Sequence, residues 1–327
     1  MKKIVILHSE IAADAPDDEL DCLVQARAIA EALSALHYEP ALLPFELNLN
    51  KNIAMLQSLK PAAVFNIVET LNARGSLIHF APALLDVLKI PYTGCGTEAV
   101  FQTSNKPLAK KMMRFAGIAT PDWVEQSGFT SQRDEGGSYL IKSSWEHASI
   151  GLDENSLIPY TGKDRLLKEM KLREEKLGGS CYAEAYIEGR EFNVALLSDK
   201  TGVRALPIAE MMFQDYGPDK LKIVDYRAKW HADSFEYNNT IRKFDFPEED
   251  APLISALSDL ALQCWNVFSL RGYARVDFRV DGNGNPWALE VNTNPCLSPD
   301  AGFAAALARA DIKYSEAIGL IMENALK

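Results

Sequence analysis

Acidic, basic and amide side chains gather in one stretch near the end of the chain, GYARVDFRVDGNGNPWALEVNTNP (272–295). Two extended runs flank the segment Gly-Asn-Gly-Asn (282–285), a composition that strongly favours a β-hairpin turn. A hairpin closed by these four residues places Asp281 opposite Pro286 and fixes the pairing of every residue behind them.

This pairing places Asp277 opposite Glu290 and Arg275 opposite Asn292. Because side chains alternate across a strand, the four polar groups share one face of the hairpin. The other face is apolar and consists of Ala274, Val276, Phe278 and Val280. The hairpin is therefore expected to have one face in a core and one face available for chemistry.

Two directly opposed carboxylates have Cβ atoms about 5 Å apart and destabilise a strand pair unless something compensates their charge. Arg275 is one candidate, and a divalent cation with oxygen ligands from Asp277, Glu290 and Asn292 is another. The alternative is a solvated acidic face on an edge hairpin. The donor-rich loop Asn-Thr-Asn-Pro-Cys follows directly, so the residues alone leave both interpretations open.

The first hundred residues alternate between strands and helices, which predicts a parallel sheet with helices on both faces. The expected strands are KKIVILH, PALLPF and AAVFNIV, and the expected helices lie at 19–37, 50–59 and 77–89. A turn-rich hinge, IPYTGCGTEA, precedes a helix that starts near Ser104 with Pro107 in its first turn.

The middle of the chain is expected to contain a strand pair around WVEQ and YLIK, a helix at 163–177 and the strand CYAEAYI. The last part should contain strands near 191–198 and 203–210, a less regular stretch at 211–232, and a helix at 249–268. The hairpin and a closing helix near 312–325 complete the prediction.

Composition and charge exclude several classes of protein. The chain has 327 residues, which suits two or three subdomains. The net charge of −11 argues against a nucleic-acid partner, and no apolar run is long enough for a membrane span. The five cysteines form no CxxC pair, which excludes a zinc or disulfide framework and favours a cytoplasmic location.

With the hairpin interpreted, ARVDF and WALEVNTNP resemble the metal-binding end of the ATP-grasp ligases, and of D-alanine–D-alanine ligases in particular. The resemblance extends over most of residues 60–327. Five further segments resemble the family in the same order along the chain: IPYTGCG, TSNKPLAKKMMRFAGIATP, YLIKSSWEHASIG, CYAEAYIEGREFNVALL and VDYRAKW. One such motif is weak evidence, whereas the ordered set of six argues against a purely structural origin.

The resemblance implies a nucleotide site. The residues that match it are Lys106, Lys142, Ser149, Glu184, Tyr186, Ile187 and Glu191. In the family the two lysines hold ATP phosphates, and the serine lies in the loop that covers them. The segment that begins at Glu184 matches the one that binds the adenine edge, with Tyr186 and Ile187 acting through backbone groups. Glu191 matches the acid that binds the ribose.

The resemblance also implies a reaction centre. Asp277, Glu290 and Asn292 match the magnesium ligands, Arg275 matches the arginine that stabilises the transferring group, and Lys229 matches a lysine near the γ-phosphate. Phosphoryl transfer requires mainly cations placed around developing negative charge, so the set is chemically consistent.

Two loops depart from the family pattern. After the first strand the family has a glycine- and serine-rich loop with an acid that helps to hold the first substrate. Here that place reads HSEIAADAPDDELD, with Glu10 and Glu19 as candidate substitutes. The phosphate-covering loop has His147, Ala148 and Ser149 where Gly-Ser-Ser is usual.

Two single residues near the hairpin also differ. Cys296 stands where the family has a glycine of the oxyanion hole, and its Cβ and sulfur restrict the approach of a substrate to the backbone. Ala301 falls where a serine is expected to contact the carboxylate of the acceptor. These changes favour an acceptor whose carboxylate is held elsewhere, or one that has none.

The sequence therefore predicts an α/β fold, α+β in its ATP-binding part, with three ATP-grasp subdomains. Their bounds are 1–97 for an N-terminal parallel-sheet domain, 98–187 for the central subdomain and 188–327 for the C-terminal one. The predicted enzyme uses ATP to join a carboxylate to an amine through an acyl phosphate. The expected metal is Mg²⁺, bound as two ions, for which Mn²⁺ can substitute.

D-Alanine–D-alanine ligation, ligation of other amino acids or small peptides, and a catalytically silent ATP-binding protein stay open as alternatives. Intact Arg275, Asp277, Glu290 and Asn292 argue against the silent protein, which has no need of a magnesium-binding face. The expected partners are amino-acid or peptide substrates, with neither nucleic acid nor membrane, and a homodimer is left open.

Overall fold

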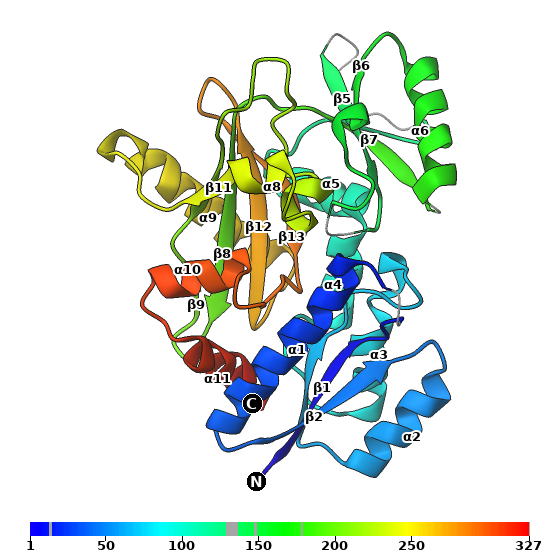
Figure 1. The fold of residues 1–327 in the computed structure, drawn as a ribbon, viewed down its shortest axis with the longest axis vertical. Helices are drawn as coiled ribbons and strands as arrows, with labels where there is room; N and C mark the ends of the chain where they lie inside the picture. The colour runs from blue at the N-terminus through cyan, green and yellow to red at the C-terminus, as the bar shows by residue number, and fades with distance from the viewer. Residues whose placement is uncertain (13–14, 129–136, 147–148, 178, 327) are drawn as a thin grey trace.

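The structure is a computed structural model that describes residues 1–12, 15–128, 137–146, 149–177 and 179–326. Across these residues it forms one parallel sheet, near the N-terminus, and two antiparallel sheets, with helices around them (Figure 1). The two antiparallel sheets lie side by side at the end opposite the N-terminus. Within the described residues, no helix has the length and apolar character that crossing a membrane requires.

The N-terminal sheet has the order β2-β1-β3, and all its strand pairs are parallel, as the alternating pattern predicts. Successive side chains of β1 point to opposite faces, so that Ile4 and Ile6 enter one core and Val5 and Leu7 another. The elements of this part are β1 (Lys3–Ser9), α1 (Asp17–Ala35), β2 (Glu39–Phe45), α2 (Leu49–Leu59), β3 (Ala63–Ile67), η1 (Gly75–Leu77) and α3 (Phe80–Leu88).

The closing helix of the chain, α11 (Tyr314–Ala325), packs against α1 and belongs to the same core as one face of the N-terminal sheet. Ile318 and Met322 join Ile29 and Leu33 in that core, and all four are buried. The N-terminal part and the last helix therefore share one hydrophobic cluster. The division at residues 97 and 187 stays a prediction.

The sheet of the middle part has the order β4-β7-β5-β6 and carries α6 on one face. The strands expected to pair with each other, β4 and β5, are instead separated by β7, whose Glu184 lies between Trp123 and Leu140. That expectation was wrong because β7, which comes later in the chain, pairs with β4 on one edge and with β5 on the other. The elements are α4 (Thr97–Ser104), α5 (Lys106–Phe115), β4 (Trp123–Glu125), β5 (Ser138–Ser143), η2 (Glu154–Ser156), β6 (Leu157–Pro159), α6 (Lys163–Leu177) and β7 (Cys181–Ala185).

The C-terminal sheet has the order β11-β10-β8-β12-β13, and β9 adds to β8. The run 203–210, expected to be one strand, is divided between β9 and β10. The elements are β8 (Arg190–Ser198), β9 (Val203–Ala205), β10 (Ala209–Phe213), α7 (Tyr226–Trp230), α8 (Phe235–Asn239), β11 (Thr240–Lys243), η3 (Glu248–Asp250), α9 (Ala251–Val267), β12 (Tyr273–Val280), β13 (Pro286–Asn292) and α10 (Gly302–Arg309).

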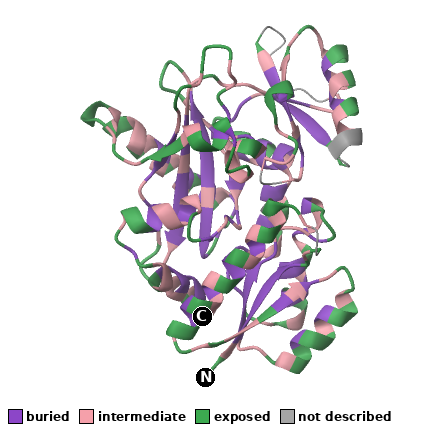
Figure 2. Ribbon diagram, in the orientation of Figure 1, coloured by how far each residue is buried: buried purple, intermediate pink, exposed green. Residues whose placement is uncertain are grey.

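The two faces of this sheet have different surroundings. One face packs against α9, α5 and α4 in a core that includes the predicted apolar set of the hairpin. The opposite face is covered by α10 and α11 only at one end, where Ala195, Leu197 and Tyr273 are buried. Figure 2 shows that the strands are largely buried, whereas the outer surfaces of α2 and α6 are exposed. The uncovered end of the second face therefore carries the polar side chains.

The hairpin has the predicted register where it matters most. Arg275 lies opposite Asn292 and Asp277 opposite Glu290, as expected. Beyond them a β-bulge shifts the pairing by one residue, so that Val280, and not Asp281, lies opposite Pro286. The extra residue is Leu289, which the bulge turns toward the pocket described below. The correction follows from this bulge, which an ideal hairpin pattern does not contain.

The turn between β7 and β8 depends on Gly189, whose φ of 145° lies in the region that favours glycine. A Cβ at this position would collide with the carbonyl oxygen of Val280 on β12. Close approach of the turn to β12 is thus possible only without a side chain.

We predict that Gly189→Ala lowers the free energy of unfolding by about 2–4 kcal/mol, because it adds backbone strain and a steric clash. Gly282→Ala, in the hairpin loop, is the matched control, since a Cβ there meets no atom within 4 Å. Urea denaturation of both variants measures the difference. Equal midpoints for the two variants would contradict this account of the turn.

Candidate functional site

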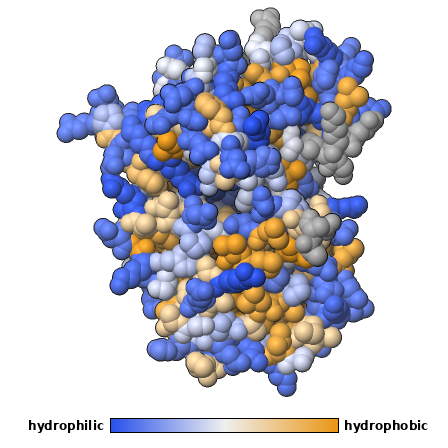
Figure 3. All heavy atoms as spheres, in the orientation of Figure 1, coloured by the Kyte–Doolittle hydropathy of each residue, from blue (hydrophilic) through white to orange (hydrophobic). Residues whose placement is uncertain are grey.

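One pocket of about 500 Å³ lies between the two antiparallel sheets and the N-terminal part, a volume typical of small-molecule sites. Figure 3 shows the surface hollowed near the middle of this face, among mostly hydrophilic residues. All the residues predicted to form the nucleotide site and the reaction centre line this pocket: Lys106, Lys142, Ser149, Glu184, Tyr186, Ile187, Glu191, Lys229, Arg275, Asp277, Glu290 and Asn292.

Asp277 lies at the centre of a dense polar network on the open face of the C-terminal sheet. The Arg275 guanidinium donates to both of its oxygens, at 2.7 and 2.8 Å. Asn193 of β8 donates to Oδ1 at 2.9 Å, and Asn292 of β13 donates to Oδ2 at 3.2 Å. The Asn292 amide also donates to Oε1 of Glu290, at 3.3 Å. The amide thus links the two opposed acids.

Burial raises the pKa of Asp277, Arg275 acts in the opposite direction, and the neighbouring Glu290 adds to the increase. Holding both carboxylates ionised side by side therefore costs free energy, which a bound cation reduces. Within the described residues no cluster of three or more His, Cys, Asp or Glu side chains has metal-binding geometry. The candidate donors are two acids and one amide, the hard oxygen ligands that Mg²⁺ prefers.

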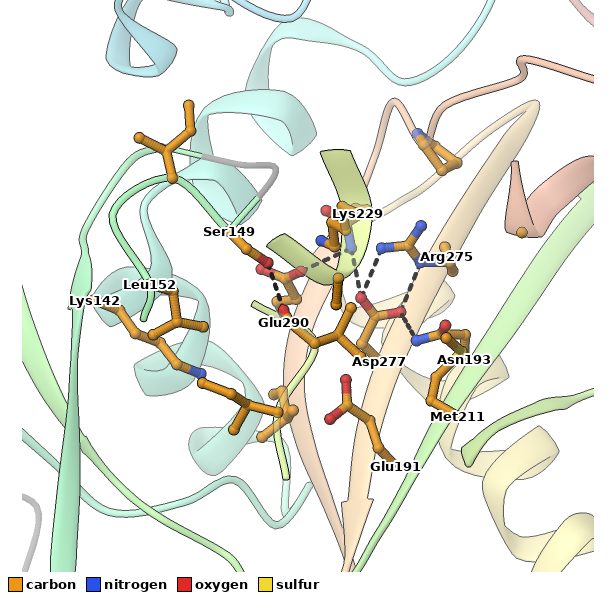
Figure 4. Close-up of a pocket in the computed structure, with 18 of the residues that line it drawn as sticks. Lys142, Ser149, Leu152, Glu191, Asn193, Met211, Lys229, Arg275, Asp277 and Glu290 are labelled. Atoms are coloured by element: carbon orange, nitrogen blue, oxygen red, sulfur yellow. Dashed lines mark hydrogen bonds and ion pairs between the residues drawn. The ribbon is translucent and has the colours of Figure 1, made fainter. Parts of the chain in front are cut away.

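Lys229, from α7, brings a further positive charge to this network. Figure 4 shows its ammonium directed toward Asp277 and Glu290. Burial and the nearby Arg275 lower its pKa, whereas Glu290, Asp277 and Glu191 act to raise it. Helix α7 is held by its N-cap Asp225, which accepts a hydrogen bond from Ala228 N–H at 2.8 Å. A short capped helix therefore positions this cation above the sheet.

Lys106 and Lys142 enter the pocket from α5 and β5. Lys106 is the first residue of α5, whose N-cap Asn105 accepts from Leu108 N–H at 3.0 Å. Its ammonium donates to the backbone carbonyl of Glu146 at 2.5 Å, and burial lowers its pKa. The side chain of Ser149 donates to the Val224 carbonyl at 2.8 Å. His147 and Ala148 lie outside the described residues.

Glu184 is held between two lysines in the wall of the pocket. Lys142 lies 2.5 Å from Oε1 and Lys110 lies 2.6 Å from Oε2. Glu184 and Lys110 are almost completely buried, with side-chain exposures of 2% and 0%. Burial acts to raise the pKa of Glu184, but the two lysines together bring it below its usual value. This acid therefore organises the lysines of the pocket wall as well as facing the cavity.

The segment after β7 offers backbone groups to the pocket. The Tyr186 N–H donates to the Ser138 carbonyl at 2.8 Å. The backbone group of Tyr186 that can bind a ligand is therefore its carbonyl. Glu191 pairs with Arg279 at 3.1 Å, and the Arg279 guanidinium lies 5.4 Å from the centre of the Tyr186 ring. Burial raises the pKa of Glu191, which Arg279 opposes.

The loop that follows the hairpin is fixed by the N-terminal part. Asp21 of α1 accepts from the Cys296 thiol at 3.0 Å and from the Ser298 hydroxyl at 2.8 Å. Gln25, one turn later, accepts from Leu297 N–H at 2.9 Å. Burial raises the pKa of Cys296 well above its usual value, so the residue is a thiol hydrogen-bond donor.

The structure changes the assignment of acids at the amino-acid end. Neither Glu10 nor Glu19, the candidate substitutes, lines the pocket, and Glu10 is exposed. Asp21 and Glu69 line it instead. The first helix begins at Asp17 and presents Asp21, the last residue of the segment HSEIAADAPDDELD, to the pocket. Sequence spacing alone does not indicate which face of α1 turns inward.

Further pocket residues were missed. Arg279 lies two and four positions after Asp277 and Arg275 on the same face of β12, so strict alternation could have identified it. Asn193 pairs with Asp277 across β8 and β12, a neighbour relation that no local pattern contains. Arg242, in β11, also lines the pocket without a sequence signal.

Comparison with known proteins gives consistent relatives. A profile of the family described as "D-ala D-ala ligase C-terminus" matches residues 112–323. The D-alanine–D-alanine ligase of Aquifex aeolicus is 29% identical over 307 residues, which cover 92% of this chain and 94% of the relative.

Two solved structures share the fold. The D-alanine–D-alanine ligase from Bacillus anthracis, complexed with ATP, has a TM-score of 0.71 and 20% identity, covering 100% of this chain and 98% of that one. The VanG D-Ala:D-Ser ligase from Enterococcus faecalis has a TM-score of 0.71 and 16% identity, covering 99% of each chain.

We predict that Glu184→Gln destabilises the protein by about 3–5 kcal/mol at pH 7, because it leaves Lys110 buried without a counter-charge. A carboxylate with a depressed folded-state pKa stabilises the fold above its unfolded pKa, and that stabilisation is lost as pH falls through the folded-state value. The difference between wild type and variant should therefore shrink below about pH 4.

Urea denaturation between pH 3 and 7 measures this difference. Glu323→Gln is the matched control, because Glu323 pairs with Lys200 at the surface, where a pair contributes about 0–1 kcal/mol. A Glu184 variant as stable as the control at pH 7 would show that the buried cluster contributes nothing.

Proposed function

Because this chain belongs to the D-ala D-ala ligase C-terminus family, we propose that it binds Mg²⁺–ATP in the pocket and uses it to join a carboxylate to an amine. The chain is a carbon–nitrogen bond-forming ligase. In the proposed reaction a substrate carboxylate oxygen attacks the γ-phosphorus and ADP leaves. The amine nitrogen of the second substrate then attacks the acyl carbon, and phosphate leaves as the amine loses a proton.

The observation that carries this proposal is the convergence of charge in a single pocket. Four cations, Lys106, Lys142, Lys229 and Arg275, come from four different elements and surround the opposed acids of the hairpin. Phosphoryl transfer depends on this kind of arrangement. The negative charge of the transition state is spread over the phosphate oxygens, and the protein forms no covalent intermediate, so catalysis depends mainly on cations placed around those oxygens.

We assign the residues to roles along the nucleotide. Tyr186 and Ile187 bind the adenine edge through backbone groups, with Glu184 beside them, and Glu191 binds the ribose. Lys106 and Lys142 neutralise phosphate charge, and the loop that carries Ser149 covers it. The ammonium of Lys142 moves from Glu184 to a phosphate oxygen at low cost, since Glu184 keeps its second partner, Lys110.

Asp277, Glu290 and Asn292 would hold the magnesium, which supplies charge neutralisation at the phosphates. A half-turn of the Asn292 amide presents its oxygen in place of the nitrogen that now faces the acids. Arg275 and Lys229 keep the transferring phosphoryl group beside the acids. Arg275 is placed to do so because its bidentate bond with Asp277 fixes the guanidinium plane.

Two substrate classes fit the pocket, D-alanine pairs and other amino acids or small peptides. The second is favoured by the loop after the hairpin, where Cys296 adds a side chain that is bonded to Asp21 and Ala301 offers no hydroxyl. An acceptor that binds here must therefore be held by groups other than those of a D-alanine–D-alanine ligase.

We predict that Asp277→Asn and Glu290→Gln each lower the kcat of ATP-dependent ligation by about 100- to 1,000-fold, because each removes charge from the reaction centre with little change in volume. ADP release, measured over a panel of D- and L-amino acids, tests both the function and these roles. Asp259→Asn, at an exposed position of α9, is the control. Wild-type turnover in either hairpin variant would refute the assignment.

We also predict that Cys296→Gly, Ala301→Ser increases D-alanyl-D-alanine formation relative to wild type, by about tenfold for a hydroxyl bonded to a charged group. Steady-state kinetics with D-alanine measure the gain. An efficient wild-type enzyme, with kcat/KM for D-alanine above about 10⁴ M⁻¹s⁻¹, would contradict this prediction, as would a double variant without any gain.

A further inference from the structure

Arg242 lies in β11, the edge strand of the C-terminal sheet opposite β13. It lines the pocket beside the start of α10. Its guanidinium donates to the backbone carbonyl of Asp300 at 3.0 Å. A Cβ on Gly302, the first residue of α10, would lie 3.5 Å from its Nε. Asp300, Ala301 and Gly302 all line the same pocket as Arg242.

The pocket contains two other arginines among its described residues, and both have a carboxylate partner. Arg275 pairs with Asp277 at 2.7 Å, and Arg279 pairs with Glu191 at 3.1 Å. Arg242 forms no ion pair with any carboxylate in the described part of the chain, and it bonds to Asp300 only through the main-chain carbonyl. Its side chain is exposed, and it therefore brings to the pocket a charge that no carboxylate of the described residues pairs with directly.

The start of α10 adds positive potential to the same place. The N-terminus of a helix carries a partial positive charge, so a cation beside it is unfavourable unless an anion joins them. A side chain at the N-cap usually bonds to the first free N–H groups, but the N-cap here is Ala301, which makes no such bond. Burial is the main cause that lowers the pKa of Arg242 and Arg275 adds to it, whereas Asp300 and Tyr237 act to raise it.

We propose that Arg242, together with the N-terminal N–H groups of α10, binds the carboxylate of the acceptor substrate. The proposal rests on the proposed ligase function and specifies its second substrate. It selects acceptors that keep a free carboxylate, such as amino acids or peptides, over amines that have none. The guanidinium supplies the charged donor in the absence of a hydroxyl at position 301, and its fork suits two carboxylate oxygens.

The test compares an acceptor with its own amide, which has lost the negative charge and can serve only as the amine. The donor and acceptor are first identified by ADP release over a panel of D- and L-amino acids, with mass spectrometry of the product. Kinetics are then measured for the acid and the amide with wild type, Arg242→Met and Arg242→Lys. Lys243→Met is the control, because Lys243 is the next residue of β11, is exposed and does not line the pocket.

We expect Arg242→Met to raise the KM for the acid about 10- to 100-fold, as loss of a charged hydrogen bond does, and to leave the KM for ATP unchanged. The amide should be poor for wild type by a similar factor and insensitive to Arg242→Met. Arg242→Lys should restore part of the affinity for the acid, and Lys243→Met should match wild type.

A KM for the acid within twofold of wild type in Arg242→Met overturns the inference, and so does a wild-type enzyme that uses the amide as well as the acid. In both cases ligation itself persists and the proposed function stands. Absence of ADP release with every amino acid of the panel overturns the proposed function, and the inference with it.

Discussion

Much of this site depends on the opposition of two acids, Asp277 and Glu290, across adjacent strands. Like charges directly opposed destabilise a sheet, and these lie on a face from which water is partly excluded. Arg275, Asn193, Asn292 and Lys229 are all directed at the two acids, from four separate elements. These groups offset part of the repulsion between the two acids, and the remaining negative charge makes the site receptive to a divalent cation.

The two halves of the pocket are held in different ways. At the nucleotide end, charges are fixed within the two antiparallel sheets, as the buried Lys110–Glu184–Lys142 cluster shows. At the amino-acid end, the loop after β13 is fixed from outside, by Asp21 and Gln25 of α1. Asn294 of this loop also donates to the Val68 carbonyl, just after β3, at 3.1 Å. The N-terminal part therefore shapes the region that we assign to the acceptor.

The fold class, family and reaction type could be predicted from sequence because they depend on local patterns in a fixed order, and the comparisons confirm them. The predicted pairing of Asp277 with Glu290 is present, but the turn residues alone do not produce it, because the observed turn pairs Val280 with Pro286 and the bulge restores the pairing at Asp277. The bulge at Leu289 was not predicted, because an ideal hairpin pattern contains no extra residue.

Four helices, α4, α7, α8 and α10, were missed. The N-caps of α4 and α10, Gly96 and Ala301, provide no capping side chain and hence no start signal. Helices α7 and α8 have capping side chains, Asp225 and Ser234, but each has only 5 residues, too few to show a helical period.

Residues that reach the pocket from distant elements show the limit of sequence reasoning. Asp21 and Arg242 were not identified because each acts through a neighbour roughly 60 to 280 residues away, Ser298 or the carbonyl of Asp300. No periodicity in α1 or β11 distinguishes them from surface charges. The individual site roles, unlike the fold, therefore stay proposals to be tested by substitution.

The shared core of α1 and α11 has a consequence for synthesis of the protein in the cell. Ile29 and Leu33 leave the ribosome early, but their partners Ile318 and Met322 are made nearly 300 residues later. At about 5–20 residues per second, that interval is roughly 15–60 seconds. During this time one apolar face of the first sheet lacks its final cover, so the nascent chain presents a surface on which chaperones can act. Helix α1 therefore gains its full set of core contacts long after it has been synthesised.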